Sequence, residues 1–357
     1  MKRRLGILEV LLLLAAGTVC AQQANPTERK FKRPKNIIVM IGDGMSTVQI
    51  YAGLTANKAP LHLEQFKYIG FSKTNSTRYV TDSGAGATAI ATGYKTNNGA
   101  IGVDSLNNPV PTILEIAEQH GLSTGLVATT DITDATPASF MAHQPKRSMQ
   151  QEIAAEFLNS GVDVFIGAGQ SHFTKRPDGR DLIAELKQKG FSVSTDINEI
   201  TAINSGKLAG FLRERSANER GDQLARTSMT AINILKQNKK GFFLMIEGSK
   251  IDDGGHGNNI DVVVNEMIDF DQTIGKVLEF ARNDKRTLIV ITGDHETGGL
   301  TLTNGNLSTG RVDGKFSTEG HTGVMVPVFA YGPGAEAFTG IYHNNTIFQK
   351  LKRAFRF

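Results

Sequence analysis

The 357-residue chain has a single cysteine, no tryptophan and little net charge. One cysteine, Cys20, excludes an intramolecular disulfide framework and a zinc-finger cysteine set. A formal net charge of +4, dispersed along the chain, is too weak for a nucleic-acid interface, so we expect no nucleic-acid-specific binding. After residue 25, no run is apolar enough to span a bilayer. The remaining composition, 39% hydrophobic and 21% charged, is that of a globular protein with a large core.

The first 21 residues are typical of a secretory signal peptide. Residues 2–4 are basic, residues 10–16 are apolar, and small residues precede a cleavage position near Ala21. Cleavage there removes three of the 39 basic and one of the 35 acidic residues, which leaves a net charge near +2 and no cysteine. We therefore expect a periplasmic or secreted protein. Lipid attachment at Cys20 and an uncleaved cytoplasmic N-terminus are the alternatives.

The polar and basic residues 22–35, with two prolines, predict a flexible arm. From residue 36 onward, short continuous apolar runs alternate with longer amphipathic segments. Continuous runs are typical of strands buried on both faces, hence of a parallel sheet covered by helices. We predict one α/β domain over 36–357, a three-layer sandwich around a mostly parallel central sheet. The expected strands are 37–41, 126–129, 162–166, 242–246, 288–292 and 326–331, and the expected helices are 112–119, 149–159, 223–238 and 262–283.

Acidic residues follow three of the expected strands. Asp43, Glu247 and the pair Asp294-His295 come directly, or after one glycine, behind an apolar run. Ligands in open α/β sheets bind beyond the carboxyl ends of the strands, so these side chains should meet at one edge. Carboxylates that meet must repel one another or share a cation.

Three more residues could complete a metal site. Asp252 and His256 stand four residues apart in a glycine-containing segment, and His321 lies further along the chain. Mixed imidazole and carboxylate ligands suit zinc, whereas an all-oxygen set suits magnesium. Each histidine taken alone could equally be a surface or capping residue.

The segment around Ser83 consists of small residues and predicts a tightly packed helix that begins at this serine. A helix start offers free N–H groups and a positive dipole end, which favour a phosphate beside the Ser83 hydroxyl. Simple capping of a buried helix by Asp82 or Ser83 is the alternative. The chain lacks the glycine of a hydrolase nucleophile elbow and an obvious histidine base, so a metal would have to activate the serine.

Arg147 follows the segment Asp134-Ala-Thr136-Pro137 and is a candidate phosphate ligand. A guanidinium group can hold two phosphate oxygens in a planar fork, which Lys146 could not do as well. Alone, Arg147 would be an ordinary solvated charge.

Seven short motifs form an ordered pattern. They are Asp43-Gly-Met, Thr81-Asp-Ser83, Asp134-Ala-Thr136-Pro, Glu247-Gly, Asp252 with His256, Asp294-His295 and Gly320-His321-Thr-Gly. With these motifs in this order, the chain resembles the alkaline phosphatase family from about residue 36 to residue 334. The resemblance implies metal-dependent hydrolysis of small phosphate monoesters, with inorganic phosphate as product and inhibitor.

The resemblance also implies a role for each motif residue. Ser83 would be the nucleophile that becomes phosphorylated, and Arg147 would bind the phosphoryl group. Two Zn²⁺ ions and one Mg²⁺ ion would complete the site. One zinc would be held by Asp252, His256 and His321, the other by Asp43, Asp294 and His295, and the magnesium by Asp43, Thr136 and Glu247.

Two features depart from the family pattern. Asp253 stands where well-known members have a lysine or histidine near the magnesium, so it should weaken phosphate binding or draw another cation. The identity of the third ion therefore stays open. The segments 147–247 and 295–321 are short for the family, which leaves formation of a homodimer open and predicts a more open cleft.

Other functions compete with this interpretation. A phosphodiesterase, a sulfatase or a phosphate-transferring mutase could use the same metals. Sulfatases need a modified residue followed by Pro and Arg, whereas Ser83 is followed by Gly84 and Ala85. Arg147 and the magnesium set favour monoesters over diesters. A metal- or phosphate-binding protein without catalytic activity is the alternative that is not an enzyme.

Overall fold

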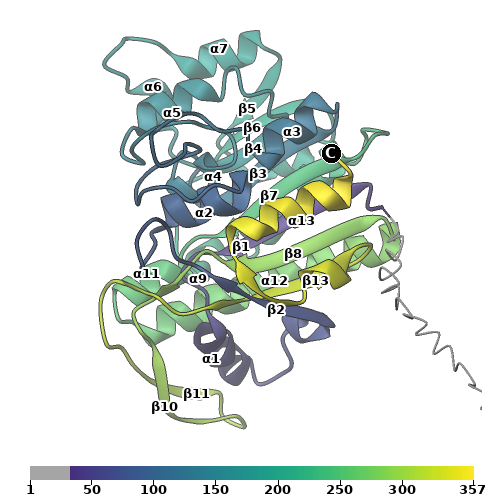
Figure 1. Cartoon of the computed structure of the whole chain (residues 1–357). Helices are drawn as coiled ribbons and strands as arrows, with labels where there is room; N and C mark the ends of the chain where they lie inside the picture. The colour runs from purple at the N-terminus through teal and green to yellow at the C-terminus, as the bar shows by residue number, and fades with distance from the viewer. Residues whose placement is uncertain (1–32) are drawn as a thin grey trace, which may run out of the picture. The chain divides into compact units, whose positions relative to one another are not determined.

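The computed structural model describes residues 33–357, which belong to one compact unit (Figure 1). The predicted signal peptide, Cys20 and most of the predicted arm lie outside the described residues. Within residues 33–357, no helix is both long and apolar enough to cross a membrane.

A ten-stranded sheet, ordered β14-β2-β13-β8-β1-β7-β3-β4-β6-β5, forms the centre of this unit. Strands β8 to β5 in this order are parallel, which confirms the predicted mostly parallel sheet. Strand β13 runs antiparallel to both of its neighbours. The strands are β1 Asn36–Gly42, β2 Tyr68–Lys73, β3 Ser123–Asp131, β4 Val164–Ala168, β5 Phe191–Ser194, β6 Lys207–Phe211, β7 Phe242–Gly248, β8 Thr287–Gly293, β13 Val326–Tyr331 and β14 Gly340–His343.

Helices cover both faces of the sheet. Alternate residues of β1 point to opposite sides: Ile37 and Val39 pack in one core, and Ile38 and Met40 in the other. The first core includes side chains of α2 (Ser83–Thr92), α3 (Ile113–Gln119) and α13 (Asn345–Phe355), and the second includes side chains of α10 (Gln223–Leu235) and α12 (Ile260–Asp284). The three layers agree with the predicted sandwich (Figure 1).

Most differences from the predicted elements lie outside the central strands. The expected helix 149–159 ends early, at Glu156. A hairpin of β10 (Thr301–Asn306) and β11 (Arg311–Lys315) and a two-residue ladder of β9 (Glu296–Thr297) and β12 (His321–Thr322) were not predicted. The remaining elements are α1 Thr47–Asn57, η1 His62–Gln65, α4 Ala135–Ala138, α5 Gln150–Glu156, α6 Ser171–Thr174, α7 Leu182–Gln188, α8 Ile197–Ala202, α9 Ala217–Arg220, α11 Ile251–His256 and η2 Ala335–Phe338.

Candidate active site

The carboxyl ends of neighbouring strands bring the predicted acidic residues together. Strand β1 lies between β7 and β8, and Gly42 at its end is in register with Gly248 and Gly293. Asp43 and Asp294 directly follow β1 and β8, and Glu247 is the penultimate residue of β7. The next strand, β3, leads into the short helix α4, which contains Thr136. The sheet order therefore places all four side chains at one edge, where the three acidic residues were predicted.

Gly44 allows the helix α11 to approach this edge. Its φ of +71° lies in the left-handed region, and a Cβ atom there would lie 2.9 Å from both the Cα atom of Asp252 and Oγ1 of Thr297. Helix α11 carries Asp252 and His256 at adjacent turns. A side chain at position 44 would push this helix, and both of its candidate ligands, away from Asp43.

The three strand-end carboxylates are buried and have unsatisfied oxygens. Asp43 Oδ1, Glu247 Oε2 and Asp294 Oδ2 accept no hydrogen bond within residues 33–357. Burial, followed by the charges of Asp294 and Asp252, raises the pKa of Asp43 well above its usual value. Burial and the charge of Asp134 raise the pKa of Glu247 to about 8, and burial and the charge of Asp252 raise that of Asp294 to about 7. Such groups stay charged at neutral pH when a cation compensates them.

Each of the three predicted histidine ligands uses Nδ1 to fix its ring. Nδ1 of His321 donates to Thr81 O at 2.9 Å, and Nδ1 of His256 donates to Glu319 O at 2.5 Å. The Thr297 hydroxyl donates to the Asp252 carboxylate, so it accepts from Nδ1 of His295, at 3.2 Å. All three rings therefore direct Nε2 into the site, in the arrangement that metal-binding histidines adopt.

The Nε2 atoms converge on one another and on the carboxylates. His256 Nε2 lies 3.2 Å from His321 Nε2 and 3.1 Å from Asp252 Oδ2. His295 Nε2 lies 3.3 Å from both Asp43 Oδ1 and Asp294 Oδ2. Two imidazole lone pairs that face each other need a proton or a cation between them. The hydrogen bond with Asp252 raises the pKa of His256 to about 9, so proton and metal compete for this position.

The ligand atoms form two overlapping clusters. Those of Asp43, Asp294 and His295 lie within 4.8 Å of one another, which is the second predicted zinc set. Those of Asp252, His321 and His295 do so as well. The first predicted set contained His256 in place of His295, and the contacts of His256 with Asp252 and His321 place it beside this cluster. His295 thus lies between the two sets.

The predicted magnesium residues form an oxygen-only group. Thr136 Oγ1 lies 3.5 Å from Asp43 Oδ2, and Glu247 is in register with Ile41, two residues before Asp43. Asp253, the residue expected to disturb this site, pairs instead with Lys250 at 2.6 Å, and its side chain is 55% exposed. The expected effect of Asp253 on phosphate binding or on the third ion stays a prediction.

Ser83 lies beside these clusters at the first position of α2. Its residue is only 2% exposed, and its Oγ lies 3.2 Å from His295 Nε2 and 3.5 Å from Arg147 Nη1. Asp134 holds the Arg147 guanidinium at 2.9 Å, and Asp82 lies 3.8 Å from it. No histidine was predicted to lie near Ser83. Burial lowers the pKa of His295 to about 3, so this imidazole is neutral and a weak proton acceptor.

Sequence reasoning missed two supporting residues. Thr297 links the ligand sets because its hydroxyl contacts Asp252 and His295. The buried Glu296 accepts hydrogen bonds from Gln49 and Thr322, which ties β12, and with it His321, to helix α1. The only sequence signal for Thr297 is its position two residues after His295.

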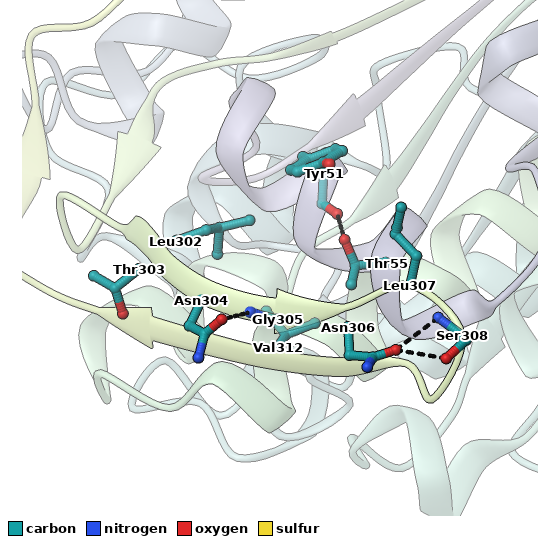
Figure 2. A pocket seen from close by; sticks show the side chains of 10 residues that line it. All are labelled: Tyr51, Thr55, Leu302, Thr303, Asn304, Gly305, Asn306, Leu307, Ser308 and Val312. Carbon is teal, nitrogen blue, oxygen red and sulfur yellow. Dashed lines mark hydrogen bonds between the residues drawn. The ribbon is translucent and has the colours of Figure 1, made fainter.

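A cavity of about 550 Å³ lies between α1 and the hairpin β10–β11, away from these clusters (Figure 2). Tyr51, Thr55, Asn304 and Leu307 are among its lining residues, none of which is acidic, basic or histidine. It therefore offers no carboxylate, imidazole or basic side chain as a catalytic group.

Comparison with known proteins gives consistent results. The model of the family described as "Alkaline phosphatase" matches residues 34–311. Alkaline phosphatase 4 of Bacillus subtilis (strain 168) is 32% identical, over 99% of this chain and 97% of that protein. The structure of alkaline phosphatase from the Antarctic bacterium TAB5 is 42% identical with a TM-score of 0.86, and the match covers 92% of this chain and 99% of that one. A histidine-to-aspartate mutant of the TAB5 enzyme, described with Mg bound in the M3 site, matches over the same shares with a TM-score of 0.85 and 42% identity.

We predict that Thr297→Val weakens metal binding at these clusters, with zinc as the probe, by about 10- to 100-fold, because the partners that orient metal ligands contribute on this scale. Thr297→Ser keeps the hydroxyl and should retain most of the affinity. Competition with a chromophoric zinc chelator measures the affinity, and the midpoint of chemical unfolding checks that both variants fold. Wild-type zinc affinity in Thr297→Val would contradict the assignment.

Proposed function

This chain belongs to the alkaline phosphatase family and is a phosphomonoesterase, and we propose that it acts through a phosphoserine at Ser83 with two Zn²⁺ ions and one Mg²⁺ ion. One observation carries the proposal. Three fixed imidazoles and several buried carboxylates converge on one site, and the hydroxyl of Ser83 contacts one of these imidazoles. The substrates are small phosphate monoesters.

The residues present fit the three ions. Mixed nitrogen and oxygen donors suit zinc, and the oxygen-only group suits magnesium. When bound, the ions neutralise charge on the phosphoryl oxygens and favour the ionised serine hydroxyl. The zinc ligands are Asp252, His256 and His321 for one ion and Asp43, Asp294 and His295 for the other, and the magnesium ligands are Asp43, Thr136 and Glu247.

The side chains around Ser83 account for the transfer of the phosphoryl group. The Ser83 hydroxyl releases its proton to solvent and its Oγ attacks phosphorus, while the bond between phosphorus and the ester oxygen breaks. The alkoxide leaves with that electron pair and takes a proton from solvent. The Arg147 guanidinium, held by Asp134, binds two of the phosphoryl oxygens in a fork. A water oxygen then attacks phosphorus, Ser83 Oγ leaves with the electron pair of its bond to phosphorus and takes up the proton that the water loses, and inorganic phosphate is released. Inorganic phosphate has the same oxygens that Arg147 binds in the substrate, so this product also inhibits the enzyme.

We propose in addition that the protein is exported and cleaved near Ala21. The basic residues 2–4 and the apolar residues 10–16 support this location. Formation of a homodimer stays a prediction. N-terminal sequencing of protein from the periplasm or the medium should find a chain that starts at Gln22, whereas a chain that starts at Met1 would contradict cleavage.

The proposed activity predicts a clear substrate order. We expect p-nitrophenyl phosphate to be hydrolysed at least about 100-fold faster than bis-p-nitrophenyl phosphate or p-nitrophenyl sulfate. Chelation should abolish the activity, and zinc with magnesium should restore it. Release of p-nitrophenol measures all three rates. A preference for the diester or the sulfate, or full activity after exhaustive chelation, would overturn the proposal.

Ser83→Ala tests the phosphoserine. The variant should lose the acid-stable phosphoenzyme and at least about 1000-fold in kcat, because the nucleophile is absent. Rapid acid quenching after incubation with labelled substrate detects the phosphoenzyme, and elemental analysis should find unchanged metal content. Turnover at the wild-type rate would exclude this role for Ser83.

Arg147→Ala is the matched comparison for Ser83→Ala. It keeps the nucleophile and should still form the phosphoenzyme, but inhibition by inorganic phosphate should weaken by about 10-fold or more because the charged fork is lost. An inhibition constant equal to that of the wild type would contradict phosphate binding by Arg147.

A further inference from the structure

A second cavity, of about 510 Å³, opens directly beside the candidate active site. Thr81 and Asp82, the two residues before Ser83, form one part of its lining, and His256 and His321 form another. It therefore adjoins the place where a phosphoryl group would contact Ser83. Under the proposed function, on which this inference rests, the attacking and leaving oxygens lie in line on either side of phosphorus, so the alcohol projects away from Ser83.

Arg78 gives this cavity an uncompensated positive charge. It is the one arginine or lysine that lines the cavity, and its guanidinium makes no hydrogen bond or ion pair with any residue in the described range 33–357. Asp82, the one carboxylate in the lining, lies 3.8 Å from Arg147 and caps α2. Arg78 thus lines the cavity, and its charge has no partner among residues 33–357.

Hydrogen bonds hold the backbone of Arg78 in place. Its N–H donates to Ser76 Oγ at 3.1 Å, and Ser76 Oγ in turn donates to Asn98 Oδ1 at 2.6 Å. The Asn98 amide also donates to Val80 O at 3.1 Å. The adjacent Tyr79 ring packs against Gly323, where a Cβ atom would lie only 2.5 Å from it. The segment that carries Arg78 is therefore anchored on both sides of the residue.

We propose that Arg78 is a specificity-determining residue that favours phosphate monoesters whose alcohol carries a second anionic group, a carboxylate or a phosphate. Both groups present paired oxygens that match the guanidinium fork. Because Arg78 is exposed, the contact contributes modestly, on the scale of about fivefold in affinity. We expect the preference for anionic alcohols to appear in KM and not in kcat. All esters give the same phosphoserine, so its hydrolysis does not depend on the alcohol.

Two esters that differ in one group provide the test. Glycerol 3-phosphate has a neutral hydroxymethyl group where 3-phosphoglycerate has a carboxylate. In the wild type, kcat/KM should be higher for 3-phosphoglycerate. Arg78→Ala should reduce the ratio of the two kcat/KM values by about fivefold, through a higher KM for 3-phosphoglycerate with little change in kcat. Arg78→Lys keeps the charge without the fork and should give an intermediate ratio.

Arg286→Ala is the control. It removes the same charge from a side chain that is 62% exposed and precedes β8, at the opposite edge of the sheet, and it should keep the wild-type ratio. An unchanged ratio in Arg78→Ala, or an equal fall in both variants, would overturn the role of Arg78 while leaving the proposed function intact. Failure of the wild type to hydrolyse either ester would overturn both.

Discussion

The repulsion between acidic side chains at the carboxyl edge of the sheet is the constraint on which the site depends. Asp43, Glu247 and Asp294 are buried, and each has a carboxylate oxygen that accepts no hydrogen bond within the described residues. Burial makes their charged forms unfavourable, and their mutual proximity adds to that effect. The surrounding structure keeps these groups together only at a cost in stability, which bound cations would offset.

The fold meets this constraint with two kinds of support. Three parallel strands in register fix the carboxylates at one edge of the sheet, with Asp43 and Asp294 at equivalent positions and Glu247 two residues earlier. The histidines depend on side-chain and carbonyl partners instead, because Thr81, Thr297 and Glu319 each bind an Nδ1 atom and turn Nε2 inward. The register of the strands therefore sets where the carboxylates lie, and local hydrogen bonds set which nitrogen of each histidine faces them.

The sequence was informative where chemistry follows directly from a strand. A continuous apolar run that ends two residues before Asp43 or Asp294 predicts both the buried strand and the location of the acid. The antiparallel direction of β13 was not predictable, because a continuous apolar run gives no strand direction. Thr297 was not predictable either, since its partner Asp252 comes from helix α11, which reaches it only through tertiary packing. The proximity of His295 to Ser83 has the same origin.

The exposed end of the site, at Arg78, and its buried end, at Asp43, respond differently to ionic strength. Strand β1 beneath Asp43 is packed on both faces by fully buried aliphatic side chains, so its end lies in a medium of low polarisability. Dissolved salt screens charges over roughly 8 Å in physiological solution, but only where water and ions can reach them. Added electrolyte therefore weakens attraction at the rim, where Arg78 is exposed, and leaves the forces between Asp43, Asp294 and His295 nearly unchanged.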